Sequence, residues 1–281
     1  MPLTGATFTG TASFHGSQSA VQPLVSIITI VFNGEKFLEQ TIQSVINQTY
    51  PHIEYIIVDG GSTDGTIEII KRYSGSISRW ISEPDQGISD AFNKGIRLAT
   101  GQLIGIINAD DWFEPEAVAA VVDNYKPGCV LHGNLQYWNQ DGSKALLVMP
   151  KQTSLPRGMT VNHPTVFLDR ELYSRYGMFD TSYKMAMDYH LLLRLYKADV
   201  PFIYINKTLA NMRFGGTSDN WVKSYQEVLR AKQEVLGKSY THHLTYHWQI
   251  MKRRVSEGLA HSPLSFINTL YRNYFSSMKK V

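Results

Sequence analysis

Carboxylate side chains stand soon after two apolar, strand-like runs of this sequence. They are Asp59 and Asp64 after the run Tyr55–Val58, and Asp110 and Asp111 after the run Leu103–Ile107. In an open α/β sheet, ligands bind at the carboxyl ends of the strands. Carboxylates at that edge can accept hydrogen bonds from a base or a ribose, and they can bind a metal ion that holds a diphosphate. The pattern therefore predicts a site for a nucleotide sugar.

The composition is that of a folded protein with an uneven charge. The chain has 281 residues, of which 43% are hydrophobic and 18% charged, so one large domain with an extension is expected. Residues 1–220 hold 17 Lys and Arg against 21 Asp and Glu, whereas residues 221–281 hold 10 against 3. The acidic first part is expected to bind a metal and a nucleotide, and the basic tail is expected to contact an anionic surface.

Neither end of the chain shows a targeting or membrane-spanning pattern. The first 22 residues carry no Lys, Arg, Asp or Glu and lack the basic start and apolar stretch of a signal peptide. No stretch approaches the roughly 20 apolar residues of a transmembrane helix. Cys129 is the only cysteine, which excludes an intrachain disulfide and fits a reducing compartment. We expect a cytoplasmic protein. Any contact with the cell membrane is expected at its inner face.

Strand and helix patterns alternate through the first half of the chain. Strands are expected at Leu24–Val31, Glu54–Val58, Arg79–Ser82 and Leu103–Ile107, and helices after Asn33, after Asp64, at Ser89–Ala99 and from Pro115. Asn33 and Asp64 are expected to cap the helices that follow them. This alternation is typical of a mostly parallel sheet with helices on both faces.

The pattern is looser after residue 128. The expected elements are a hairpin of Val130–Tyr137 and Leu146–Met149 around Asp141–Gly142, strands at Thr165–Leu168 and Phe202–Ile205, and a helix at Met187–Tyr196. From Trp221 onward we expect two or three helices, broken near Gly237, Gly258 and Pro263.

Four strings in order resemble family 2 of the glycosyltransferases, which have the GT-A fold. They are SIITIVFNGEKFLEQTIQSVINQTY, EYIIVDGGSTDGT, EPDQGISDAFNKGIRLATG and INADDW, within residues 24 to about 115, with weaker matches to about 218. One string alone is a weak signal, but four in order are specific. The resemblance implies an α/β fold with a Rossmann-like, mostly parallel central sheet flanked by helices. Together with the composition and charge of the two ends, it divides the chain into a flexible arm (1–22), a GT-A domain (23–218, with a nucleotide-binding half 23–115 and an acceptor half 116–218) and a basic helical extension (219–281).

Several residues are expected to bind the donor. The loop Thr29–Glu35 presents backbone amides at a helix start, which suit a polar ligand. The resemblance makes Asp59 the acid that accepts the ring N–H of the base, and it brings the segment after residue 84 close to the donor. The donor-side candidates are Thr29, Val31, Asn33, Glu35, Asp59, Asp85, Asp90, Lys94, Asp110 and Arg213. Glu35 either takes a ribose hydroxyl or stabilises the first helical turn, and Asp90 and Lys94 either meet the donor or form a helix salt bridge.

The resemblance also implies a metal site. Asp110 and Asp111 match the family's metal-binding acids, and two hard oxygen ligands suit Mg²⁺ or Mn²⁺ bridging a diphosphate. Members of the family often carry an Asp two positions before this pair, where this chain has Asn108. The substitution removes one charge and is expected to weaken metal binding without removing the pair.

The acceptor side is expected in the second half of the domain. MAMDYHLLLRL resembles the family segment that supplies the general base, so Asp188 would deprotonate the acceptor hydroxyl, with helix capping as its alternative role. Met187 stands where the family often has a second acid. His163 in NHPTVF would lie on the acceptor side. Arg213 and Ser218 lie in NMRFGGTSDN, and one or the other would meet the diphosphate if this segment is a closing loop; the alternative is a surface turn.

The expected function is therefore that of an inverting glycosyltransferase with Mn²⁺ or Mg²⁺ as cofactor. It would move a hexosyl or N-acetylhexosaminyl group from a UDP-, GDP- or dTDP-linked donor to a saccharide hydroxyl, with a polyprenyl-diphosphate-linked acceptor in surface polysaccharide synthesis. No nucleic-acid module is recognised. The basic and aromatic residues of the tail suit peripheral membrane contact; they are Trp248, Lys252, Arg253, Arg254, Tyr271, Tyr274, Phe275, Lys279 and Lys280.

Two other functions stay open from the sequence. A non-catalytic nucleotide-binding scaffold of the same fold is allowed by Asn108 and Met187. A nucleotidyltransferase is less favoured, because its triphosphate needs a basic, Gly-rich first loop and this one has only Lys36 and one glycine.

Overall fold

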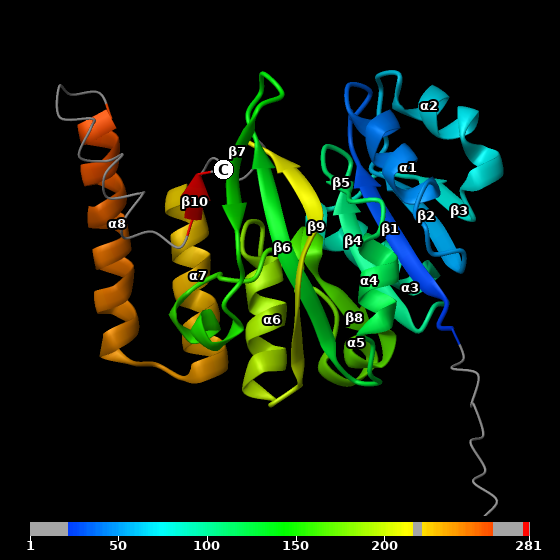
Figure 1. The fold of residues 1–281 in the computed structure, drawn as a ribbon. Coiled ribbons are helices and arrows are strands. Elements are labelled where there is room, and N and C mark those ends of the chain that lie inside the picture. The colour runs from blue at the N-terminus through cyan, green and yellow to red at the C-terminus, as the bar shows by residue number, and fades with distance from the viewer. Residues whose placement is uncertain (1–21, 216–220, 261–277, 281) are drawn as a thin grey trace, which may run out of the picture.

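The computed structural model describes residues 22–215, 221–260 and 278–280. Four parallel strands form one part of a mixed sheet, in the order β4-β1-β2-β3 (Figure 1). They are β1 (Val25–Val31), β2 (Ile53–Asp59), β3 (Arg79–Ser82) and β4 (Leu103–Asn108). β1, β2 and β4 are buried almost throughout, as apolar parallel strands covered on both faces must be.

The register of β1 sets which loops meet at the edge of the sheet. β1 pairs in parallel with both β2 and β4, so that Val31 lies opposite Asp59 and Ile30 lies opposite Asn108. All three strands therefore end at the same edge, where the sequence predicts the polar residues.

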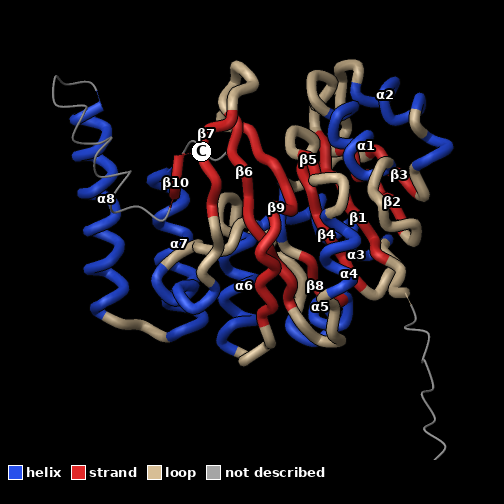
Figure 2. The backbone as a smooth tube through the Cα atoms, viewed as in Figure 1, coloured by secondary structure: helices blue, strands red, loops and turns tan. Residues whose placement is uncertain are grey.

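Beyond β4 the sheet is mainly antiparallel, so the prediction of a mostly parallel sheet holds only for the first half. The strands are β8 (Phe167–Asp169), β6 (Val130–Trp138), β7 (Lys144–Val148), β10 (Met278–Lys280), β9 (Phe202–Arg213) and β5 (Trp112–Phe113). β6 and β7 form the predicted hairpin, whereas β9 runs parallel to β6 and also pairs with β5 (Figure 2).

Helices cover both faces of the sheet because side chains alternate along the strands. Ile28, Ile56 and Ile104 face one apolar core, which also contains residues of α3 (Ile88–Leu98), α5 (Arg170–Tyr176) and α6 (Met187–Lys197). Ile27, Ile57 and Leu103 face the other core, with α1 (Leu38–Ile46), α2 (Thr66–Arg72) and α4 (Ala117–Asp123). The short 3₁₀ turns are η1 (Ser74–Ser76), η2 (Gln152–Arg157) and η3 (His163–Thr165).

The helix after the predicted boundary at residue 219 is part of the body of the molecule. α7 (Trp221–Leu236) packs on α6, and its Val228 and Ala231 are buried in the same core. Gly237, at φ 88°, separates α7 from α8 (Tyr240–Ala260) as predicted. α8 runs through Gly258 and is described as far as Ala260, close to the break expected near Gly258, and Pro263 lies outside the described residues. Among the helices that the structure describes, none combines the length and apolarity of a membrane span.

Some local predictions are wrong for identifiable reasons. Asn33 does not cap α1, since it adopts φ 49° and its side chain accepts a hydrogen bond from the Thr63 N–H instead. Asp64 does accept from the N–H of Thr66, the first residue of α2, although Gly65 directly precedes the helix. The strand expected at Thr165–Leu168 starts later, after the turn η3. The strand expected at Phe202–Ile205 is longer and extends to Arg213, through a bulge opposite Gly133–Leu135.

Gly105 allows β8 to pack against β4, which gives a test of the fold. An added Cβ at Gly105 would lie 2.5 Å from a ring carbon of Phe167, in the closely packed core. We expect Gly105→Ala to destabilise the protein by about 1–3 kcal/mol through overpacking, measured by urea unfolding. Gly75→Ala is the control, because nothing lies within 4 Å of its added Cβ. Equal stability of the two variants would contradict this packing.

Candidate functional site

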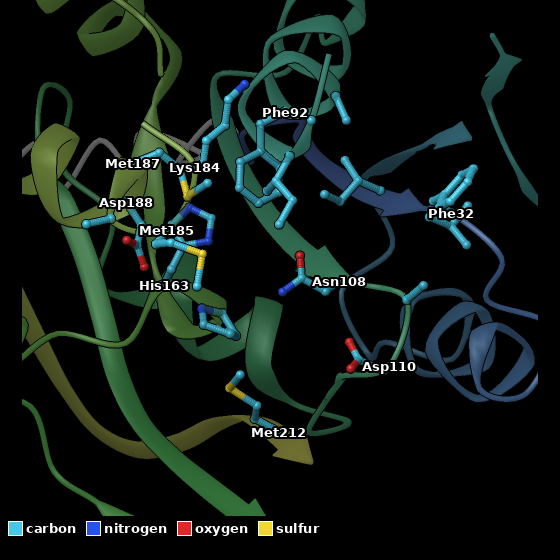
Figure 3. Close-up of a pocket in the computed structure, with 18 of the residues that line it drawn as sticks. Phe32, Phe92, Asn108, Asp110, His163, Lys184, Met185, Met187, Asp188 and Met212 are labelled. Atoms are coloured by element: carbon cyan, nitrogen blue, oxygen red, sulfur yellow. The ribbon is translucent and has the colours of Figure 1, made fainter. Parts of the chain in front are cut away.

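A cavity of about 890 Å³ lies at the carboxyl ends of β1 and β4. One wall is the sheet edge, with Asn108 and Asp110, and the opposite wall carries His163 and Asp188 (Figure 3). Segments far apart in the sequence complete the lining: Phe32–Gly34, Asp85, Gly87, Phe92, Tyr137, Met159, Lys184–Tyr189, Met212, Ser224 and Val228. The cavity thus joins the predicted nucleotide-binding half, the acceptor half and α7.

Asp59 organises the loop after β2 and does not line the cavity. Its side chain is fully buried, and its Oδ2 accepts hydrogen bonds from the N–H groups of Gly61 and Ser62 at 3.0 Å each and from the Ser82 hydroxyl at 2.6 Å. The Ser62 hydroxyl donates to its Oδ1. The oxygens of Asp59 are thus occupied by the loop and by Ser82, and its predicted contact with a base stays a prediction.

Asp85 is the carboxylate that lines this end of the cavity. It lies against Gly60, whose added Cβ would overlap Asp85 Oδ2, while Asp85 Oδ1 accepts from the Gly87 N–H at 2.7 Å. The ring of Phe32 lines the cavity nearby and is 65% exposed. An acceptor oxygen and an open aromatic face are the two groups that recognise a planar base.

Two other donor-side candidates tie loops together. Glu35 Oε2 accepts from the Gly65 N–H at 2.7 Å, and the Glu35 N–H donates to Asp64 Oδ2 at 3.1 Å. Asn33 lines the cavity and fixes the same loops, since its N–H donates to the Ser62 hydroxyl at 2.7 Å. Thr29 is buried inside β1 and bonded to the Tyr55 hydroxyl, whereas Val31 reaches the cavity.

Asp90 and Lys94 form the salt bridge that was the alternative to donor binding. Lys94 Nζ lies 3.6 Å from Asp90, 2.8 Å from Glu83, and donates to the Pro84 carbonyl at 2.8 Å. Asp90 in turn accepts from the Gln86 N–H. Neither side chain lines the cavity, so the pair holds the loop that carries Asp85.

The two adjacent acids after β4 lie in different environments. Asp110 and Asn108 line the cavity, but Asp111 is 1% exposed and does not. Burial, followed by the charge of Asp110, raises the pKa of Asp111 well above its usual range. Among the described residues its Oδ1 has no hydrogen-bond partner, and a cation coordinated beside it would compensate for that lack.

These residues fit a divalent metal held partly by substrate. The described residues contain no group of three His, Cys, Asp or Glu that could hold a metal ion. Mg²⁺ is commonly bound through one or two carboxylates together with substrate phosphates. Asp110, the amide oxygen of Asn108 and a diphosphate in the cavity would meet that requirement, with the buried Asp111 behind them.

Arg213 supports the Asp110 loop from outside the cavity. Its guanidinium donates to the Asp110 carbonyl and to Gln40 Oε1, and it lies 4.3 Å from the ring centroid of Phe37 and 4.4 Å from that of Trp112. Arg213 thus contacts the Asp110 loop, and its predicted contact with a diphosphate stays a prediction. Ser218 lies outside the described residues.

Asp188 lies in the first turn of α6 and is not its cap, because Ala186 precedes the helix. Burial raises the pKa of Asp188 to about 6, and the nearby charge of Glu227 adds to the effect. Its Oδ1 accepts only from the adjacent Tyr189 N–H among the hydrogen bonds in the described part of the chain. A half-buried carboxylate with this pKa suits a general base near neutral pH.

His163 forms an aromatic part of the same wall. It is 8% exposed, and its ring centroid lies 5.2 Å from that of Phe92 and 5.5 Å from that of Phe179. Burial lowers the pKa of His163 to about 4, so the ring is neutral at physiological pH. The neutral ring can donate or accept a hydrogen bond, but it would have no charge interaction with an acceptor substrate.

Sequence reasoning missed several residues of the site. Phe32 gives no signal in the sequence beyond its place after β1, and Tyr137 and Ser224 reach the cavity from elements that were not placed near it. Lys184 lines the cavity and donates to the Gln86 carbonyl at 2.9 Å, which joins the two walls. Of these residues, Ser224 reaches the cavity because α7 packs against α6.

Comparison with known proteins agrees with this arrangement. The chain is 32% identical to the chondroitin synthase of Escherichia coli over 201 residues, which covers 67% of this chain but only 29% of that protein. It is also 32% identical over 179 residues to a glycosyltransferase of Mycobacterium tuberculosis, covering 61% of this chain and 68% of that one.

Solved structures share the fold at lower identity. The mannosyltransferase PcManGT from Pyrobaculum calidifontis, in complex with GDP-Man and Mn²⁺, matches with a TM-score of 0.66 and 17% identity, over 92% of this chain and 83% of its own. S. aureus TarS in complex with UDP-GlcNAc matches with a TM-score of 0.61 and 18% identity, over 85% and 73%. The fold is therefore the predicted GT-A fold.

A family model gives the assignment directly. The model described as Glycosyl transferase family 2 matches residues 26–177, more than half of the chain. This segment contains the sheet edge, the Asp85 loop and the Asp110 loop. The chain belongs to glycosyltransferase family 2.

Proposed function

We propose that this chain is an inverting glycosyltransferase that takes a nucleoside diphosphate sugar as donor and a saccharide hydroxyl as acceptor. The observation that carries the proposal is the cavity of Figure 3, in which Asp110 lies across from Asp188 and whose lining also includes Asp85. The raised pKa of Asp188 supports its role as the general base.

The proposed reaction is one displacement. The acceptor oxygen attacks the anomeric carbon and forms the new glycosidic bond, while the bond from that carbon to the diphosphate oxygen breaks. The electron pair of the broken bond stays with the diphosphate, and the acceptor proton passes to Asp188. Attack from the face opposite the leaving group inverts the anomeric centre.

Asp110 and Asn108 are the residues proposed to hold Mn²⁺ or Mg²⁺, with Asp111 behind them. When bound, the metal would offset the charge that develops on the departing diphosphate. The Mn²⁺ complex of the similar mannosyltransferase supports this cofactor. Arg213 contributes by fixing the Asp110 loop, and Asp85 with Phe32 would bind the base.

The donor and acceptor classes rest on the similar proteins. Complexes of these contain UDP-GlcNAc, UDP or GDP-Man, which supports a hexosyl or N-acetylhexosaminyl donor on UDP or GDP. Chondroitin and hyaluronan synthases among the relatives support a polysaccharide product. We propose a growing saccharide, linked to a polyprenyl diphosphate, as acceptor.

A stripe on α8 supports contact with an anionic membrane surface. Tyr240, Leu244, Trp248, Met251 and Val255 recur every three or four residues on one side of the helix, and all are between 49% and 76% exposed. Lys252 and Arg254 flank this α8 stripe, and no Asp or Glu occurs from Lys238 to Val255. An exposed apolar stripe with a cationic border is typical of a helix that lies in the lipid headgroup region.

The donor subsite is tested with a panel of UDP, GDP, dTDP and CMP, each with and without Mn²⁺, by thermal shift and titration calorimetry. We expect one diphosphate to bind in a metal-dependent manner. Asp85→Asn, and Gly60→Ala through its clash with Asp85, should each weaken that nucleotide about tenfold or more, as expected for one lost hydrogen bond to a charged group. Gly75→Ala is the matched control. Unchanged affinity in both variants would place the base elsewhere.

Asp188→Asn tests the base. With the donor that the panel identifies, we expect nucleoside diphosphate release to fall by about 10²–10⁴-fold while donor affinity is kept. In the wild type, release should decline as the pH falls through about 6, because Asp188 must be ionised to accept the proton. Asp199→Asn, after the other end of α6, is the control. Unchanged turnover in the Asp188 variant would favour the non-catalytic scaffold.

The α8 stripe is tested by co-sedimentation with vesicles. We expect the wild type to bind phosphatidylglycerol vesicles more than phosphatidylcholine vesicles, and Trp248→Glu to reduce that binding several-fold, because it places a negative charge in the stripe. Val222→Glu, at a part-exposed position of α7, is the control. If Trp248→Glu leaves vesicle binding intact, or if it changes the oligomeric state instead, the membrane proposal fails.

A further inference from the structure

The carboxylate of Glu227 forms an unusual set of contacts with the segment that leads into α6. Its Oε2 accepts hydrogen bonds from the N–H groups of Met185 at 2.8 Å and Ala186 at 2.9 Å, and the Lys184 N–H donates to Oε1 at 2.9 Å. Three consecutive backbone donors thus converge on one side chain from α7. Charge-assisted hydrogen bonds of this kind are shorter and stronger than neutral ones.

We propose that Glu227 is a positioning residue for the reaction, which holds the segment 184–186 and thereby fixes Asp188 against the donor loop. This proposal rests on the proposed function of Asp188. The held segment lines the cavity, and Asp188 follows it after a single residue, Met187. A shift of this segment would therefore move the base directly.

The same segment also controls the donor side. Lys184, whose N–H is held by Glu227, extends its ammonium group to the Gln86 carbonyl at 2.9 Å. Gln86 follows Asp85, and the added Cβ of the adjacent Gly87 would lie 3.6 Å from Lys184 Nζ. One carboxylate on α7 thus fixes a chain of contacts that runs from the general base to the loop proposed to bind the nucleotide base.

Charged groups reach the cavity of Asp188 from several elements: Lys184 from the segment before α6, and Asp85 and Asp110 from the loops before α3 and after β4. The charge of Glu227 acts on Asp188 from α7, and Tyr137 faces it from β6 with a pKa raised to about 12, so it is neutral. His163 from η3 lines the same cavity and is also neutral. Removal of the Glu227 charge should therefore lower the pKa of Asp188, because a like charge no longer opposes its ionisation.

Glu227→Gln is the main test, since it keeps the size of the side chain but removes the charge and leaves one acceptor oxygen. We expect donor hydrolysis, with water as acceptor, to slow by about tenfold to a hundredfold in kcat, the effect of a misplaced catalytic group. The acid limb of the pH profile should move to lower pH. Glu227→Asp keeps the charge, so it should restore the position of the acid limb. It should also restore part of the rate.

Glu234→Gln is the matched control, because it removes a carboxylate from the same helix. Glu234 bonds to Tyr183 and Arg230 and not to the segment 184–186. Two measurements do not need turnover: amide hydrogen exchange of residues 184–186, and a ¹³C NMR titration of Asp188. We expect faster exchange and a lower Asp188 pKa in Glu227→Gln only.

The outcomes separate this inference from the proposed function. If Asp188→Asn abolishes donor hydrolysis but Glu227→Gln behaves like Glu234→Gln in rate, pH profile, exchange and titration, the role of Glu227 is wrong and the proposed function stands. If Asp188→Asn leaves hydrolysis unchanged, the proposed function is wrong. A loss of stability common to both α7 variants, with no change in the pH limb, would mean that Glu227 only packs α7 and would overturn the inference.

Discussion

The site depends on the parallel pairing of β1 with both β2 and β4. That register brings Val31 beside Asp59 and Ile30 beside Asn108, so the loops after these strands meet at one edge. The strands are held in place by two apolar cores, one on each face of the sheet. The loops therefore do not have to stabilise the sheet by apolar packing, and their polar groups can form hydrogen bonds at its edge.

Most polar residues near the cavity serve to hold loops, and few face the cavity. Asp59, Glu35, Lys94 and Arg213 have their charged groups occupied by backbone or neighbouring side chains. Asp85, Asp110 and Asp188 line the cavity. This division follows from the cost of leaving backbone groups unpaired in loops that must keep a fixed shape. It also explains why a residue such as Glu227, outside the cavity, can matter for a group inside it.

The sequence predicted the strands and helices of the first half well, because most of them are buried apolar runs or amphipathic segments of clear period; the short, half-exposed β3 is the exception. It also predicted that polar loops after β1, β2 and β4 meet at one edge of the sheet. It did not predict the length of β9, whose Asn206 and Lys207 interrupt the apolar pattern at a bulge. It assigned roles to Asp59 and Asp111 by motif, whereas their burial depends on how loops close around them. The contribution of α7 depends on contacts across more than forty residues, such as that of Glu227 with Ala186, and no local pattern encodes these.

The central claim is that a base on α6 faces a donor held at the sheet edge, so that attack comes from the side opposite the diphosphate. The stereochemistry of the first product tests this most directly. ¹H NMR of the sugar released from the donor, recorded before the anomers equilibrate, gives the configuration of the anomeric carbon. The account predicts the anomer opposite to that of the donor, formed at a rate that falls with protonation of Asp188. Release of the same anomer as in the donor would contradict it, because retention needs a second displacement or attack from the face of the leaving group.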